Sequence, residues 1–151
     1  MTDTTLATAI KHNHQTAYVT KDIEAARAAF TEMFGVEEYD SFDAKLDVID
    51  DNKEKIGEIS LRLSFALDRT IELIQPLDDP FDAFTVDPSG PVLQFHHVGA
   101  TVDDVDQAVS DAQAEGLKVA RMAIPGLMEV AFVHLGPAAD HYIEYVPPMP
   151  G

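Results

Sequence analysis

The chain contains two copies of one short pattern, and this repeat limits the folds open to it more than any other feature. The segment "HQTAYVTKDIEAA", residues 14–26, aligns with "HHVGATVDDVDQA", residues 96–108. In each copy, a stretch rich in apolar and β-branched residues precedes an aspartate that can cap a helix, Asp22 in the first and Asp103 or Asp104 in the second. Apolar residues at helical spacing follow. Each copy therefore predicts a strand that leads into an amphipathic helix.

The segments that follow each expected helix are typical of strands. In the first copy Gly35 ends the helix, and strands are expected at residues 36–42, 46–50, 58–67 and 70–76, with an exposed hairpin loop at 50–58. In the second copy Gly116 ends the helix, and strands are expected at 117–123, 126–135 and 141–146. Each copy is thus predicted to be a βαβββ module, which gives an α+β fold with two modules in a cupped mixed sheet.

The predicted organisation is a single domain over residues 1–151. Module one covers residues 13–76 and module two covers residues 93–147. Between them, residues 77–92 hold three prolines, one glycine and four aspartates, a composition that favours a linker over a helix or strand.

Composition excludes several kinds of function. The chain has no cysteine, so disulfides, thiolate metal sites and cysteine nucleophiles are absent. Its formal net charge of −17 repels polyphosphates, so nucleic acid is not an expected partner, and heavily anionic substrates such as CoA esters are disfavoured. No apolar run approaches the ~20 residues of a membrane helix, and the first residues lack a signal-peptide pattern, so a cytoplasmic location is expected.

The repeat also selects candidate ligands of a metal ion. Gln15 and His97 each lie seven residues before the aligned aspartate, so they occupy equivalent positions on the first strand of each module. Strand alternation places them on the face opposite the helix, together with the small residues Ala17 and Gly99, which leave room beside them. A slip of one residue in the register would put His14 in the place of Gln15.

Two glutamates occupy equivalent positions on the last strand of each module. The segments "TIELIQP" and "HYIEYVPP" share an Ile-Glu step followed by proline, which pairs Glu72 with Glu144. A carboxylate between apolar residues of a strand is costly to bury alone. Two of them at matched positions therefore indicate a shared cation.

Over residues 13 to 147 the chain resembles the vicinal oxygen chelate superfamily, the group of glyoxalase I, methylmalonyl-CoA epimerase and the extradiol dioxygenases. The segments "HHVGATVDD" and "EVAFVHL...YIEYV" carry most of the resemblance. It implies that two βαβββ modules hold one divalent metal in a cup, and that the ligands are Gln15, Glu72, His97 and Glu144. It also implies a homodimer, in which a site lies within one chain or is shared between two.

This ligand set is similar to that of the zinc-type glyoxalase I enzymes and suits Zn²⁺, Ni²⁺, Mn²⁺, Co²⁺ or Mg²⁺. A glutamine in place of the first histidine of the extradiol dioxygenases counts against oxygen chemistry on iron. The resemblance implies a lyase or isomerase that polarises a carbonyl of a small, neutral or weakly anionic substrate. Glu144 would move a proton on the adjacent carbon, with Glu72 as the second proton carrier.

The alternative is a non-catalytic binding protein of the same fold, similar to the bleomycin-resistance proteins, that sequesters a cationic or aromatic ligand. The acidity of the chain favours this alternative, whereas the four matched ligands favour the enzyme. Among the other histidines, His96 is expected to be a non-ligand and His134 to be structural or to line the cavity.

Overall fold

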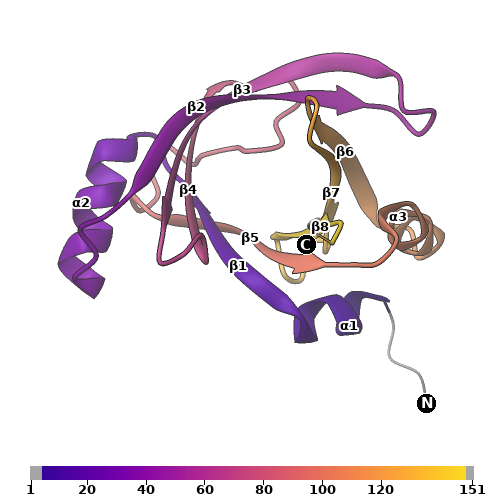
Figure 1. Ribbon diagram of the computed structural model, residues 1–151, viewed down its shortest axis with the longest axis horizontal. Coiled ribbons are helices and arrows are strands. Elements are labelled where there is room, and N and C mark those ends of the chain that lie inside the picture. Colours follow the sequence, from indigo (N-terminus) through magenta and orange to yellow (C-terminus); the bar gives the residue numbers. More distant parts are fainter. Residues whose placement is uncertain (1–4, 149–151) are drawn as a thin grey trace. The chain divides into compact units, whose positions relative to one another are not determined.

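The computed structural model describes residues 5–148, which form three helices and eight strands (Figure 1). The helices are α1 (Thr5–Lys11), α2 (Ile23–Phe34) and α3 (Val105–Ala114). The strands are β1 (Asn13–Val19), β2 (Asp40–Ile49), β3 (Lys55–Ala66), β4 (Ile71–Asp78), β5 (Gln94–Thr101), β6 (Lys118–Ile124), β7 (Met128–His134) and β8 (Tyr142–Val146). The α+β class and the order βαβββ, twice over, are confirmed. The ends of the expected 1–151 domain, residues 1–4 and 149–151, lie outside the described residues.

The described residues divide into two compact units. The α2 unit contains residues 15–46 and 58–96, and the α3 unit contains residues 5–14, 47–57 and 97–148. The α2 unit therefore contains most of module one and the linker. The tip of the β2–β3 hairpin, although it belongs to module one in sequence, is part of the α3 unit.

In the α2 unit, helix α2 covers one face of the strands (Figure 1). Asp22 caps the helix, since its side chain accepts hydrogen bonds from two backbone N–H groups, and Gly35 ends it in a left-handed conformation with φ of 70°. Strand β1 pairs in parallel with β4, and β4 pairs antiparallel with β3. Ile23, Ala26 and Phe30 of the helix are buried against Leu73 of β4. Burial of each large side chain stabilises the unit by about 1.5–3 kcal/mol.

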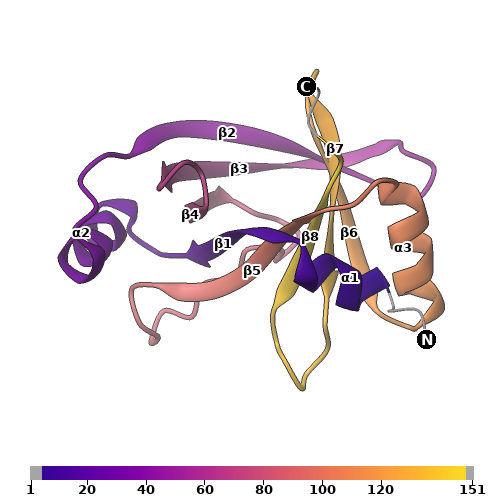
Figure 2. The same ribbon diagram turned by 60° about the horizontal axis from the view of Figure 1, so that its bottom comes forward.

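The α3 unit has the same plan. Strand β5 pairs in parallel with β8, β8 pairs with β7, and β7 pairs with β6, both antiparallel. The outer strand β6 pairs in addition with residues 47–49 of β2. Asp104 rather than Asp103 caps α3, and the helix buries Ala108, Val109 and Ala112 against Ile143 and Tyr145 of β8 and against β7 (Figure 2).

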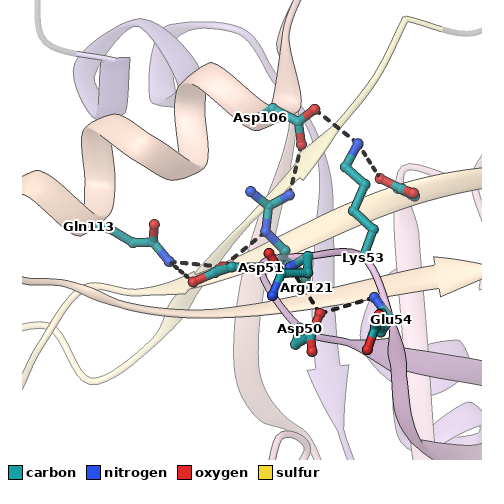
Figure 3. A network of polar contacts seen from close by, with 9 residues as sticks. Asp50, Asp51, Lys53, Glu54, Asp106, Gln113 and Arg121 are labelled. Atoms are coloured by element: carbon teal, nitrogen blue, oxygen red, sulfur yellow. Dashed lines mark hydrogen bonds and ion pairs between the residues drawn. The ribbon is translucent and has the colours of Figure 1, made fainter.

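A network of ion pairs attaches the β2–β3 hairpin to the rest of the α3 unit (Figure 3). Lys53 Nζ lies 3.0 Å from Asp106 Oδ2 on α3 and 3.2 Å from Glu129 Oε2 on β7. Arg121 of β6 donates to Asp106 Oδ1 at 2.8 Å and to Asp51 Oδ1 at 3.3 Å. Hydrogen bonds from Arg121 and then from Lys53 lower the pKa of Asp106 below its ordinary value of 3.8. The loop expected at residues 50–58 is shorter than predicted, because β3 already begins at Lys55.

Two local expectations are wrong. Residues 36–42 and 46–50 do not form two strands; one strand, β2, runs from Asp40 to Ile49. Strand β2 begins only at Asp40 because Tyr39 is hydrogen-bonded to α2. The Tyr39 hydroxyl donates to the carbonyl of Arg27 at 3.0 Å and lies 2.9 Å from Thr31 Oγ1. Helix α1 was not expected from the sequence. It packs on α3 (Figure 2). Its residue Ala9 is buried in the core of the unit.

No helix among residues 5–148 has the length and apolar character that crossing a bilayer requires.

Candidate functional site

In the α3 unit, strands β5 and β8 bring His97 and Glu144 together. His97 Nε2 lies 3.5 Å from Glu144 Oε1, the histidine is completely buried, and the glutamate side chain is 14% exposed. Val98 and Ala100, the neighbours of His97 along the alternation, pack in the α3 core, so His97 lies on the opposite face as predicted. The imidazole nitrogen and the carboxylate oxygen are thus two metal-capable atoms that face each other.

Aromatic side chains surround this pair on the same face of the sheet. Phe132 of β7 contacts His97 edge-to-face with ring centroids 5.1 Å apart, and Tyr142 of β8 contacts Phe132 with centroids 6.3 Å apart. Phe132 is directly opposite Glu144 in the β7–β8 register. The Glu144 side chain on this face is only 14% exposed, and low exposure to water strengthens any charge interaction there.

His134 extends this aromatic row on β7. Its ring lies edge-on to Tyr142 with centroids 4.8 Å apart, its Nδ1 accepts a hydrogen bond from the backbone N–H of Gly136 at 3.0 Å, and its Nε2 lies 3.4 Å from Asp140 Oδ1. The hydrogen bond from Gly136 leaves Nδ1 unprotonated in the neutral ring and so places the proton on Nε2. His134 therefore lines this face and is held by its own turn, in agreement with its expected role.

In the α2 unit, Gln15 and Glu72 lie on one face of neighbouring strands. Tyr18 and Leu73 pack against α2, so alternation turns Gln15, Ala17 and Glu72 to the other face. Gln15 Nε2 donates to the carbonyl of Arg69 at 3.1 Å, which fixes the amide at the β3–β4 turn.

The two units use the same strand register. Ala17 of β1 is paired with Glu72 of β4, and Gly99 of β5 is paired with Glu144 of β8. In both units, therefore, a small residue lies beside the glutamate, and the candidate nitrogen or oxygen ligand lies two residues earlier on the same strand. The alignment of the repeat thus describes real equivalence of strand positions.

The other histidines near these strands do not fit a ligand role. His96 is buried, its Nε2 lies 2.7 Å from the carbonyl oxygen of Ala83, and its ring stacks on Phe84 with centroids 4.9 Å apart. His14 alternates with Gln15 along β1, so its side chain lies on the face opposite to that of Gln15. The register therefore favours Gln15 over His14.

Each unit offers one pair of metal-capable side chains, and the types of donor fit a divalent ion that accepts oxygen and imidazole ligands. Within neither unit do three or more His, Asp or Glu side chains of residues 5–148 gather in a way that would hold a metal ion. The set of four takes two members from each unit, so it stays a prediction.

Residues 14–132 match a sequence model described as the Glyoxalase/Bleomycin resistance protein/Dioxygenase superfamily. This match covers more than half of the chain, so the protein belongs to that superfamily, and the resemblance drawn from the sequence is confirmed. No curated protein matches the sequence.

Solved structures with the same fold include two methylmalonyl-CoA epimerases. The one from Mycobacterium tuberculosis is 17% identical, with a TM-score of 0.53 over 92% of this chain and 89% of that chain. The one from Streptomyces coelicolor, in complex with 2-nitronate-propionyl-CoA, is 14% identical, with a TM-score of 0.53 over 90% and 96%. A hypothetical protein from Bacillus halodurans C-125 is 16% identical, with a TM-score of 0.55 over 92% and 95%. At these identities the likeness shows the fold alone.

Sequence reasoning missed Phe132 and Tyr142 as neighbours of the candidate site. A signal for Tyr142 was present, because it lies two residues before Glu144 and must share its face. Phe132 lies two residues before His134 and shares its face in the same way. The sequence did not reveal which residues of β5 and β7 lie opposite each of them, since that depends on the register between strands.

Proposed function

We propose that this protein is a metal-dependent isomerase or lyase whose ligands are Gln15, Glu72, His97 and Glu144. The observation that carries the proposal is the contact between His97 and Glu144, together with the matched register that gives Glu72 the same strand position as Glu144. A bound divalent ion would act as a Lewis acid on a substrate carbonyl and make the adjacent C–H more acidic.

In this proposal Glu144 accepts the proton from the carbon next to the carbonyl, and Glu72 is the second carrier, which returns a proton. Glu144 suits the role of base because its side chain is mostly buried beside Phe132 and retains 14% exposure. His97, fully buried beside Glu144 and Phe132, supplies an imidazole nitrogen to the metal and does not itself move a proton. Phe132 and Tyr142 exclude water from the carboxylate.

The substrate class follows from charge. Two of the structural neighbours are methylmalonyl-CoA epimerases by name, but the net charge of −17 on this chain disfavours a ligand as anionic as a CoA ester. We therefore propose a small carbonyl compound that is neutral or weakly anionic. A second copy of the chain is the proposed protein partner, and light scattering of the purified protein measures this directly.

The test combines metal content with proton exchange. The protein is purified without a polyhistidine tag, loaded with Zn²⁺, Ni²⁺, Mn²⁺, Co²⁺ or Mg²⁺ in turn, and analysed for bound metal. Hydroxyacetone, a small neutral carbonyl compound with an acidic adjacent C–H, is then incubated with each form in D₂O, and loss of its proton signal is followed by NMR. We expect one metal ion per chain and exchange that falls by roughly 100-fold or more in Glu144→Gln.

Glu129→Gln is the matched control, because it removes the same charge from the neighbouring strand β7, where the carboxylate pairs with Lys53. It should leave both metal content and exchange unchanged. Exchange that is equal in Glu144→Gln and in the unmodified protein would contradict the assigned base. A chain that binds none of the five ions would contradict the ligand set and favour the binding-protein alternative.

A further inference from the structure

The α2 unit contains a cavity of about 660 Å³ that borders two candidate ligands: Phe65 in its wall is paired with Glu72 across β3 and β4, and the Arg69 carbonyl accepts a hydrogen bond from Gln15. It lies where the segment after α2 meets the β3–β4 turn, and all of its lining comes from this unit. Its volume falls in the range of roughly 300–1,000 Å³ that is usual for small-molecule sites. The lining is made of two segments, residues 34–40 and residues 65–69.

A cation already occupies one wall of this cavity. The Arg69 guanidinium carbon lies 4.8 Å from the centroid of the Phe65 ring, and Arg69 Nη2 lies 2.8 Å from Asp40 Oδ2. The Phe65 ring is held in place, because Phe42 stacks on it with ring centroids 5.8 Å apart. The Phe65 side chain is also buried. An aromatic face and a carboxylate that hold a guanidinium form a site of the kind that also holds an organic ammonium ion.

The cavity has more acidic groups than this one cation neutralises. Its lining includes four carboxylates and the single guanidinium of Arg69. The carboxylates of Glu37, Glu38 and Asp68 are exposed. They make no hydrogen bond or ion pair to any other residue that the structure describes. Apolar surface lies between them, since Phe34 is 62% exposed and Leu67 is 53% exposed.

These features decide between classes of ligand. An anion is repelled by the carboxylates, a neutral ligand gains no charge interaction with them, and a cation is attracted to them. A metal ion requires carboxylates gathered around one point, and the carboxylates that line this cavity do not form such a group. An organic cation with an aromatic body satisfies both the carboxylates and the apolar wall.

We propose that the cavity lined by residues 34–40 and 65–69 is a binding site for a small organic cation, an amine or ammonium compound with an aromatic body. The amine lies near Glu37, Glu38 and Asp68, and the body packs on Phe34 and Leu67. Arg69 competes with it for Phe65 and Asp40. Binding of an amine here requires no metal ion, so the titration below can succeed or fail whatever the metal content of the chain.

Three probes of nearly equal shape test the ligand class: 2-phenylethylamine, a cation; 2-phenylethanol, which is neutral; and phenylacetate, an anion. Each is titrated into the full-length protein and followed by two-dimensional amide NMR. We expect the amine to shift signals of residues 34–40 and 65–69 with a dissociation constant of about 1 mM. The alcohol should bind about tenfold more weakly and the anion not at all.

A sharper test removes the guanidinium of Arg69, which competes with the amine for Phe65 and Asp40. Arg69→Gln should bind the amine several-fold more tightly, because the Phe65 ring and Asp40 become available. Arg62→Gln is the matched control: it removes the same charge from β3, where Arg62 pairs with Asp43 outside the cavity. Glu37→Gln combined with Glu38→Gln should weaken binding, whereas Glu32→Gln, on the exposed side of α2, should not.

Equal binding of the amine and the alcohol would overturn the proposal. So would equal tightening in Arg69→Gln and Arg62→Gln, since that would reflect net charge alone. Amine-induced shifts located elsewhere in the chain would also overturn it. All of the substituted positions are exposed, so each variant is expected to fold.

Discussion

The two units repeat one arrangement of strands and differ in the side chains placed on it. In both, a glutamate of the last strand lies opposite a small residue of the first strand, Ala17 with Glu72 and Gly99 with Glu144. Two residues before the small residue, one unit has the amide of Gln15 and the other has an imidazole. The backbone therefore fixes where each candidate ligand lies, and the side chain at that position would decide how strongly it binds a metal ion.

The largest expected effect concerns this difference between amide and imidazole. His97→Gln should lower divalent-metal affinity on the order of 100-fold, because imidazole is a far better ligand than a neutral amide. Gln15→His should raise the affinity. Isothermal titration with Zn²⁺ and Ni²⁺ measures both, and circular dichroism checks that the buried His97 position still folds after substitution.

Thr16→His provides the control for that pair, because residue 16 neighbours Gln15 but points to the other face of β1. If Gln15→His and Thr16→His change metal affinity equally, the new histidine acts through surface binding and not through the predicted ligand position.

A smaller effect, on the free energy of unfolding, is expected from a substitution on the faces that pack against the helices. Leu73 and Tyr145 follow the two matched glutamates, and both are completely buried. The Tyr145 hydroxyl has no hydrogen-bond partner among the residues that the structure describes. Tyr145→Phe should therefore leave the free energy of unfolding in urea unchanged or raise it by about 1 kcal/mol. A clear loss of stability would reveal a partner for this hydroxyl, such as a buried water molecule.

The same residue gives a pH prediction with a definite sign. Burial, followed by the nearby charges of Asp111 and Glu115, raises the pKa of Tyr145 from 10.0 to about 12. The unfolded chain releases this proton first, so stability present below pH 10.0 is lost as the pH rises toward about 12. As the pH rises from 10.0 to about 12, the free energy of unfolding measured from urea curves should fall more steeply in the unmodified protein than in Tyr145→Phe.

The smallest effect compares the first turns of the two helices. Asp106 of α3 pairs with Arg121 at 2.8 Å and Lys53 at 3.0 Å, whereas the equivalent Glu24 of α2 lies 3.9 Å from Arg27. Asp106→Asn should lower the free energy of unfolding by about 1 kcal/mol or less, because the Asp106 side chain is 53% exposed, and Glu24→Gln should lower it less still.

The pH dependence identifies the cause. The lowered pKa of Asp106 means that its contribution is present above its ordinary pKa of 3.8 and is lost as the pH falls further. Added salt should also reduce it. The free energies of unfolding of Asp106→Asn and the unmodified protein should become equal at pH 2 and in high salt. If they still differ there, Asp106 has a role other than these ion pairs.

Much of the fold followed from the sequence because its signals are local. Asp22, Asp104 and Gly35 act at the helix ends that their side chains and backbone favour. The two-residue period of the strands put Gln15 and His97 on the faces away from the helices. Helix α1 was missed because its stability comes from Ala9 packing on α3, a contact between distant segments. The start of β2 was missed because Tyr39 bonds to α2.

The sequence by itself determined the duplication, the equivalence of the two glutamates and the faces on which the candidate ligands lie, because strand and helix periods are properties of neighbouring residues. Tertiary structure decided which strands pair and in what register. It brought His97 within 3.5 Å of Glu144, placed Phe132 against both, and put Arg69 over Phe65 at the rim of an acidic cavity. These contacts join residues far apart in the chain, and their geometry depends on packing that no local pattern encodes.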